Sequence, residues 1–245
     1  MKTAVLLVIL LQLFCSCNGQ ENKISATTYT QKLEYGLHGA VKEVTGYIHT
    51  IENGKIPTDT ADYAGKTSMT FDHSGNMLAM HRLWKSDTTG NRKRSKTEFK
   101  LLFSGKGKDI SFKEIYRFGD GDVEEGNYSY VWSDDYNYTI VSSGKSAYRS
   151  VITLDQNYRL IKSVFMKGDS IQVTEELDFM CNNNKIQEKR TKTTENRNGG
   201  MEVSYQLQVT QEYDRYGNPT VIYGYDDLEK ERLREVYYKV YTYYE

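Results

Sequence analysis

The stretch Phe71-Asp72-His73-Ser74-Gly75-Asn76-Met77-Leu78 decides the fold. An aromatic residue ends one segment, and the Asp72 carboxylate that follows is placed to accept hydrogen bonds from the backbone just ahead. Gly75 supplies the positive φ that closes the loop. The stretch therefore predicts a tight turn between two antiparallel strands.

The same frame recurs along the chain. A close match runs from Tyr213 to Thr220, and looser copies begin at Phe103, Trp132, Leu154 and Phe179. Because the spacing between copies varies, they form a family of hairpins and not a fixed-period solenoid.

Two of the looser copies lack the glycine of this frame. Tyr136 and Tyr158 occupy its position. A bulky residue with positive φ is disfavoured. We therefore expect these two turns to differ from the others.

The segments between the turns alternate as strands do. Val203, Tyr205, Leu207 and Val209 are separated by single polar residues. We predict an all-β protein: an antiparallel meander of roughly twelve to fourteen strands in one large twisted, curled sheet or open barrel. The polar stretches 88–96 and 189–200 are expected to be surface loops.

The frame of Tyr213 to Asn218 resembles the YD repeats of the Rhs family. The stretch from Leu37 to Val44 also resembles the start of small exported bacterial proteins that carry degenerate copies of these repeats. In the Rhs family such turns join strands into β-sheet shells. The resemblance implies architecture and carries over no active residues.

The N-terminal residues predict an exported protein. Lys2 precedes an apolar run from Ala4 to Phe14, which is too short to span a bilayer as a helix. Ser16 before Cys17 resembles a bacterial lipoprotein signal, in which Cys17 carries the lipid and becomes the mature N-terminus. The alternative is cleavage after Gly19 and free secretion.

These features give a domain plan and a location. Residues 1–16 are the signal peptide, 17–34 an N-terminal tether and 35–245 the β-hairpin repeat domain. The expected location is the cell envelope, as an outer-membrane lipoprotein, with a periplasmic or secreted protein as the alternative. Cys181 is then the lone cysteine of the domain, which excludes an intramolecular disulfide there.

Composition excludes several function classes. The chain has 245 residues, 32 basic and 33 acidic residues, and a net charge of −1. This balance argues against a nucleic-acid partner. The 21 tyrosines are typical of half-buried strand positions, and flat amphipathic rings also suit sugars and peptides.

No motif indicates an enzyme, a metal or a cofactor. The carboxylates between Asp120 and Asn127 lack the glycine and the closing acid of a calcium loop. Adjacent carboxylates, such as Glu175 and Glu176, point to opposite faces of a strand and make no acid–base pair. His73 and His81 are expected at the surface or in packing contacts.

The leading hypothesis is therefore a non-enzymatic envelope lipoprotein that binds a protein or glycan partner. Tyr128, Tyr130 and Trp132 share one side of a strand and are the candidate ligand contacts, although a place in the core is the favoured interpretation of all three. One alternative function is a hydrolase of envelope polysaccharide, which requires two carboxylates about 5–10 Å apart. Another alternative is a lipid carrier, which requires a continuous apolar concave face.

Overall fold

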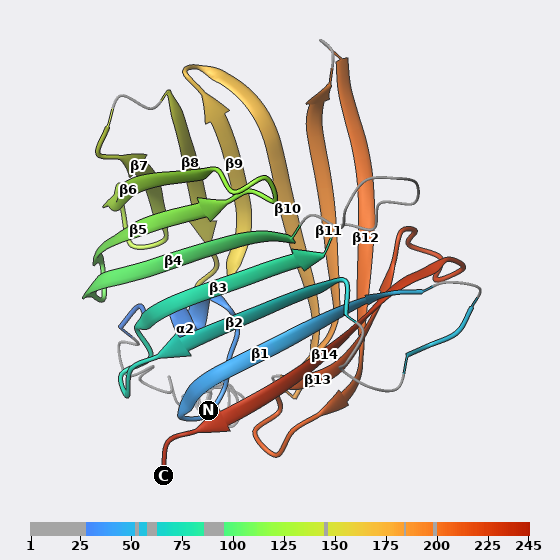
Figure 1. The fold of residues 1–245 in the computed structure, drawn as a ribbon. Coiled ribbons are helices and arrows are strands. Elements are labelled where there is room, and N and C mark those ends of the chain that lie inside the picture. Colours follow the sequence, from blue (N-terminus) through green and yellow to red (C-terminus); the bar gives the residue numbers. More distant parts are fainter. Residues whose placement is uncertain are drawn as a thin grey trace, which may run out of the picture.

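The chain folds into a closed antiparallel barrel (Figure 1). The computed structural model describes residues 28–51, 54–57, 63–85, 96–144, 147–183, 185–197 and 200–245. The elements are the helix α2 (Gln31–Glu34) and the strands β1 (Val41–Thr50), β2 (Gly65–Phe71), β3 (Met77–Lys85), β4 (Lys96–Lys106), β5 (Asp109–Arg117), β6 (Val123–Trp132), β7 (Asn137–Ser142), β8 (Tyr148–Leu154), β9 (Leu160–Lys167), β10 (Ser170–Asn182), β11 (Lys185–Arg197), β12 (Gly200–Tyr213), β13 (Pro219–Tyr225) and β14 (Leu233–Tyr243).

Closure distinguishes this fold from the expected sheet or open barrel. The all-β meander is confirmed, and each strand pairs with the next. In addition, β1 pairs with β14, from Val41 opposite Tyr243 to Thr50 opposite Glu235. This pairing gives both terminal strands a second neighbour, which removes the exposed edges that an open sheet must protect.

One expected loop is a strand. Residues 189–200 were predicted as a polar loop, but β11 extends through Arg197 and β12 begins at Gly200. The charged side chains of β11 alternate between water outside the barrel and its polar interior, so the strand needs no apolar face. Most of the other expected loop, 88–96, lies outside the described residues, and Lys96 already belongs to β4.

All six copies of the repeated frame form turns between strands, as predicted. They connect to β3, β5, β7, β9, β11 and β13. In an up-and-down barrel every second turn lies at the same end, so the copies gather along one end of the barrel. We call this end the motif rim and the other end the open rim.

The predicted turn chemistry is present in detail. The backbone N–H groups of Ser74 and Asn76 both donate to Asp72 Oδ1, at 2.9 Å each. Gly75 adopts a φ of 89°. Asp214 accepts the corresponding pair of bonds, from Tyr216 and Asn218.

The expectation for the two tyrosine turns is correct for one and wrong for the other. Tyr158 takes a φ of 62°, so its turn keeps the glycine geometry despite the bulky side chain. Its ring packs against that of Tyr29, with centroids 5.7 Å apart. This packing offsets the cost of the left-handed backbone. Tyr136 has no positive φ, as expected.

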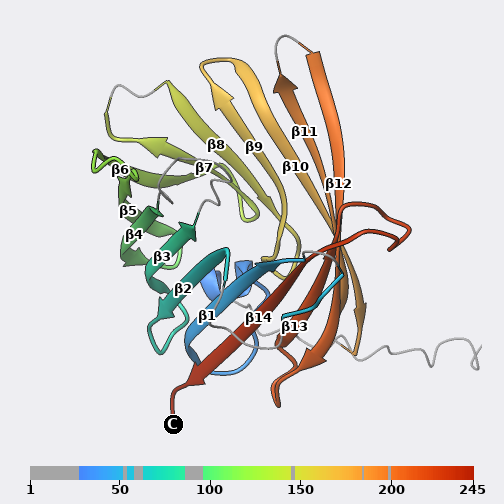
Figure 2. The same cartoon turned by 45° about the vertical axis from the view of Figure 1, so that its right-hand side comes forward.

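Residues 28–40, here called the plug, enter the barrel at the motif rim. Figures 1 and 2 show α2 inside the ring of strands. The Lys32 N–H donates to the Gly75 carbonyl, and the Met77 N–H donates to the Gln31 side chain. Part of the predicted tether, 28–34, thus packs within the barrel.

The plug identifies the inner face of the wall. Residues opposite one another in neighbouring strands share a face. Met69, Met80 and Leu101 are such partners, and they pack with Leu37 of the plug. Their face therefore lines the interior, and its apolar residues form two clusters around the plug, near the motif rim.

Candidate ligand-binding lumen

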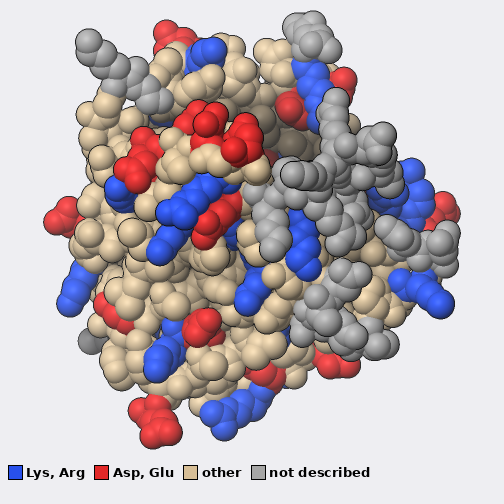
Figure 3. All heavy atoms as spheres, viewed as in Figure 1, with Lys and Arg blue, Asp and Glu red and all other residues tan. Residues whose placement is uncertain are grey.

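The barrel interior is filled near the motif rim and open beyond it. A barrel of eight strands has just enough room for its own side chains, and larger barrels enclose a cavity. This barrel has fourteen strands, and the plug occupies only one end of it. In Figure 3 the space-filled surface is hollowed near its upper edge.

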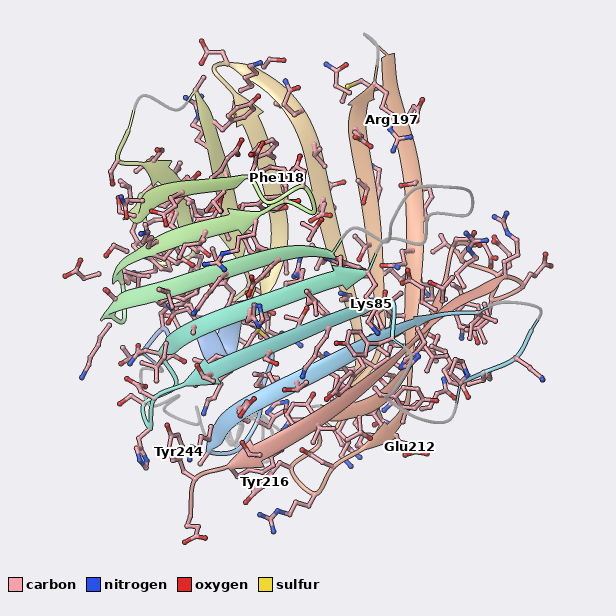
Figure 4. All side chains as sticks on the ribbon, in the orientation of Figure 1. Lys85, Phe118, Arg197, Glu212, Tyr216 and Tyr244 are labelled. Atoms are coloured by element: carbon pink, nitrogen blue, oxygen red, sulfur yellow. The ribbon has the colours of Figure 1, made fainter. Side chains whose placement is uncertain are left out.

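Aromatic rings stand exposed in this open part of the lumen. Trp84 lies opposite Gly65, where a Cβ would be 2.6 Å from the ring, and it is 39% exposed. Phe165 and Tyr148 stack with centroids 5.4 Å apart and remain 39% and 43% exposed. Phe118, at the open rim (Figure 4), contacts Tyr116. Exposed rings inside a cavity are a feature of ligand-binding sites.

Two carboxylates lie beside a ring on the inner face of β5 and β6. Glu114 is opposite Gly126 and Glu124 is opposite Tyr116, so the two acids occupy diagonal positions. Burial, and then the charge of Glu124, raise the pKa of Glu114. The Tyr128 ring fills the space above Gly126, where a Cβ would lie 2.6 Å from Tyr128 Cε2.

The opposite wall of the lumen is polar. The register places Gln208, Gly224 and Glu235 in one inward-facing row. Tyr237 donates a hydrogen bond to Glu235, and Gln206 donates to both. This wall offers hydrogen bonds where the β4–β6 wall offers rings.

The predicted ligand contacts all face inward, but they divide into two environments. Tyr130 and Trp132 pack into the cluster around Tyr29, whose ring lies 4.7 Å from that of Trp132. Tyr128 lies farther along the strand, stacked on Phe112 at 5.1 Å, and borders the open lumen. The geometry thus leaves Tyr128 as the member of the three that borders free space.

A half-buried carboxylate joins the plug to the wall. Glu34 accepts hydrogen bonds from the hydroxyls of Tyr29, at 2.5 Å, and Tyr138, at 2.8 Å. Burial raises the pKa of Glu34, and these two hydrogen bonds oppose that effect. The arrangement fixes the plug. It joins residues that are far apart in the sequence, since Glu34 and Tyr138 lie 104 residues apart.

The other sequence candidates do not converge on a site. His73 stacks on Tyr244, and His81 pairs with Glu98 on the outer wall. Glu175 faces the lumen, whereas Glu176 pairs with lysines outside, as expected for neighbours on a strand. Among the described residues no group of His, Cys, Asp or Glu is arranged to hold a metal ion.

Cys181, near the end of β10, and Asp120, in the turn after β5, take no part in the site. The Cys181 thiol is exposed and accepts a bond from Arg159 at 3.3 Å. Asp120 accepts from the Asp122 N–H in the turn between β5 and β6. This turn is the tip of the β5–β6 hairpin.

A shallow hollow on the outer wall is less suited to a ligand. Glu98, Lys100, Ile115 and Arg117 line it. Glu98 already pairs with His81 at 2.7 Å and lies 3.8 Å from Arg117. These ion pairs engage Glu98 and Arg117 of the hollow.

Sequence reasoning missed Trp84, Tyr148, Phe165 and the Glu114–Glu124 pair. All five lie at alternate positions of their strands, so the sequence indicates which neighbours in each strand share a face of the sheet with them. The sequence did not show that this face encloses a cavity, because that requires the closed register of the barrel.

The comparisons with known proteins give no family. No protein-family model and no curated protein matches the chain. A solved structure of a porin-like protein from Bacteroides uniformis aligns with 84% of this chain and 99% of its own, at 9% sequence identity and a TM-score of 0.30. No helix among the described residues is long and apolar enough to cross a membrane.

Proposed function

We propose that this protein is a non-enzymatic, lipid-anchored binding protein of the cell envelope that holds a glycan in its lumen. The observation that carries the proposal is the set of half-exposed aromatic rings on the inner wall, at Trp84, Tyr148 and Phe165. Other strands carry carboxylates and an amide on the same inner face, at Glu114, Glu124, Glu235 and Gln206. Sugars offer apolar faces to rings and hydroxyls to such polar groups.

The polar composition of the lumen favours a glycan over a lipid. A lipid carrier needs a continuous apolar face, but Glu114, Glu124 and Glu235 interrupt the inner wall. Leaving these groups unhydrated against an acyl chain would cost several kcal/mol each in an apolar contact, on the order of the penalty for unpaired buried polar groups.

The outer wall favours a barrel that stands in water beside the membrane. Lys113, in the middle of β5, pairs with Glu125 of β6, and Glu176 of β10 lies between two lysines. A lysine facing lipid at the bilayer midplane costs about 2–4 kcal/mol. Attachment through a lipid on Cys17, outside the described residues, suits such a barrel.

The anchor is tested by radiolabelled palmitate and detergent partitioning of the full chain expressed in a Gram-negative host. The wild type is expected to take up label and enter the detergent phase, and the Cys17→Ser variant to do neither. If the wild type takes up no label and stays in the aqueous phase, the result would contradict the anchor and favour cleavage after Gly19.

Calorimetric titration with a panel of neutral and acidic oligosaccharides tests the glycan site. Trp84→Ala and Phe165→Ala are each expected to weaken binding about tenfold, which corresponds to about 1.4 kcal/mol. Tyr205→Ala is the matched control, because Tyr205 is 45% exposed on the outer face. Equal affinity in all three variants would place the ligand outside the lumen.

Glu114 and Glu124 support a second candidate, hydrolysis of envelope polysaccharide. Diagonal positions on paired strands lie about 7–8 Å apart, which is within the spacing of an inverting glycosidase. The raised pKa of Glu114 suits a general acid. Reducing-sugar release that is lost in Glu114→Gln, with binding retained, would replace the non-enzymatic proposal. No release from any panel member would count against hydrolysis.

The repeated turns carry a proposal of their own. Their Asp and Gly geometry, together with the Tyr213–Asn218 frame, supports a relationship to degenerate YD repeats. Here the repeat serves to build a barrel rim, and it assigns no activity.

A further inference from the structure

One arginine of β3 points into the lumen. Arg82 lies opposite Thr67 of β2 and Phe99 of β4. Met80, two residues before it, packs in the inner cluster, and residues two apart in a strand share a face. Arg82 is half-buried, so the exposed part of its side chain lies inside the barrel.

The wall around Arg82 carries no countercharge. Its inner-face neighbours on β2, β3 and β4 are all neutral: Gly65, Thr67, Met69, Met80, Trp84, Thr97, Phe99 and Leu101. The first acid along this wall, Glu114 of β5, is two strands away, or about 10 Å between backbones. The plug adds no free acid, because the hydroxyls of Tyr29 and Tyr138 already engage Glu34.

Arg82 differs in this respect from the other arginines that the structure describes. Arg215 lies over the ring of Tyr216, at 4.8 Å from its centroid. Carboxylates lie within 4.0 Å of the rest: Arg117, Arg149, Arg159, Arg190, Arg197, Arg232 and Arg234.

The Arg82 guanidinium has neither kind of partner among the described residues. Its Nε atom is buried and makes no hydrogen bond. A buried donor without an acceptor is unfavourable, and natural proteins contain few of them. A ligand that brings an acceptor to Arg82 therefore gains free energy from this contact.

Trp84 lies beside Arg82 on the same face of β3. Its ring lies across Gly65, where a Cβ would be 2.6 Å from the ring, and the residue stays 39% exposed. The ring thus rests against β2 and presents its other side to the lumen. Two residues along a strand span about 7 Å. One monosaccharide unit with an acidic substituent can bridge this distance.

We infer that Arg82 binds the acidic group, a carboxylate or a sulfate, of a glycan unit that stacks on Trp84. The inference rests on the proposed glycan function and specifies its ligand class as acidic oligosaccharides. A planar guanidinium offers parallel N–H donors to such a group, and these charge-assisted hydrogen bonds are stronger than neutral ones. Arg82 selects the charged unit, and Trp84 holds the face of the sugar.

The test is calorimetric titration of the full chain with digalacturonate, the neutral galactose disaccharide and inorganic sulfate. The wild type is expected to bind digalacturonate about tenfold more tightly than the neutral disaccharide. Arg82→Gln should remove most of that preference, and Arg82→Lys, which keeps the charge without the paired donors, should weaken it less. Arg117→Gln is the matched control and should leave it intact, because Arg117 lies beside Glu98 on the outer wall.

The melting temperature without ligand gives a second readout. Arg82→Gln is expected to melt no lower than Arg117→Gln, because Arg82 has no partner to lose. A markedly lower value would reveal a stabilising contact of Arg82 within the protein and contradict the subsite.

The outcomes separate the subsite from the proposed function. Equal binding of the two sugars by the wild type, or a preference that survives in Arg82→Gln, would overturn the subsite and leave glycan binding in place. Sulfate binding that Arg82→Gln abolishes, with neither sugar bound, would support an anion site at Arg82 and overturn the glycan function. No binding of sulfate or of either sugar would overturn both.

Discussion

At the residue scale, the asparagine that ends the repeated frame also bonds to residues outside its own turn. Asn218 is fully buried, and its side-chain amide donates to the His38 carbonyl at 2.9 Å while its Oδ1 accepts from the His38 N–H at 2.7 Å. Asn76, 5% exposed, accepts from Gly107 of the adjacent turn. The motif therefore links the turns to the plug and to one another.

Replacement of Asn218 by alanine should test this link. The substitution leaves the His38 N–H and carbonyl without partners, which costs about 1–3 kcal/mol for an unsatisfied buried group. We expect urea unfolding to show a loss of about 2 kcal/mol. Asn137→Ala is the control, because Asn137 holds the same place in an exposed turn, and its side-chain amide bonds only to Asp134 among the described residues. Equal losses would mean that the plug contact adds nothing.

The sequence predicted much at this scale. Asp72 and Gly75 behave as the chemistry of the turn requires. Tyr158 departs from expectation because its contact with Tyr29 depends on the plug, which local reasoning does not see. The burial of Asn218 depends on the same element.

At the element scale, the plug depends on the Glu34 carboxylate. Its hydrogen bonds to Tyr29 and Tyr138 connect α2 to β7. Burial raises the pKa of Glu34, so the folded protein binds this proton more tightly than the unfolded chain does. Stability from this group is complete below its unfolded pKa and is lost as pH rises through the raised folded value.

This linkage predicts the pH dependence of a Glu34→Gln variant. From about pH 4.5 upward, near the ordinary pKa of glutamate, the stability of the wild type relative to the variant should decline. Urea unfolding at about pH 4.5, 6 and 7.5 measures the difference.

Glu176→Gln should show the opposite slope. Hydrogen bonds from Lys162 and Lys192 lower the pKa of Glu176, so its contribution to stability is present above the unfolded pKa and is lost on acidification.

For Glu34→Gln, a stability difference from the wild type that does not change with pH would contradict the raised pKa of Glu34.

At the scale of the whole molecule, the sequence predicts strands but not their closure. The hairpin signals at Asp72 and Asp214 are local, whereas the pairing of Val41 with Tyr243 joins opposite ends of the chain. No alternating pattern distinguishes an inner face from an outer one. In β12 the apolar residues Val203 and Tyr205 point outward and are 51% and 45% exposed, while Gln206 and Gln208 face the lumen.

That inversion explains why the candidate site was only partly anticipated. Tyr128 was identified because its strand looks aromatic on one side. Trp84 lies at the far end of β3, beside Gly65, and only the closed barrel turns it toward a cavity. The polar lumen and the aromatic rings together constitute the site.

The central claim is that a glycan enters the lumen and contacts its aromatic rings. The two tryptophans allow a direct measurement, because Trp84 lines the open lumen and Trp132 packs against Tyr29. In a Trp132→Phe variant, Trp84 is the lone fluorophore of its type. Titration with neutral and uronic-acid oligosaccharides should shift its emission to shorter wavelength in a saturable manner, while a Trp84→Phe variant stays silent. No shift in the Trp132→Phe variant with any of the oligosaccharides would contradict the claim.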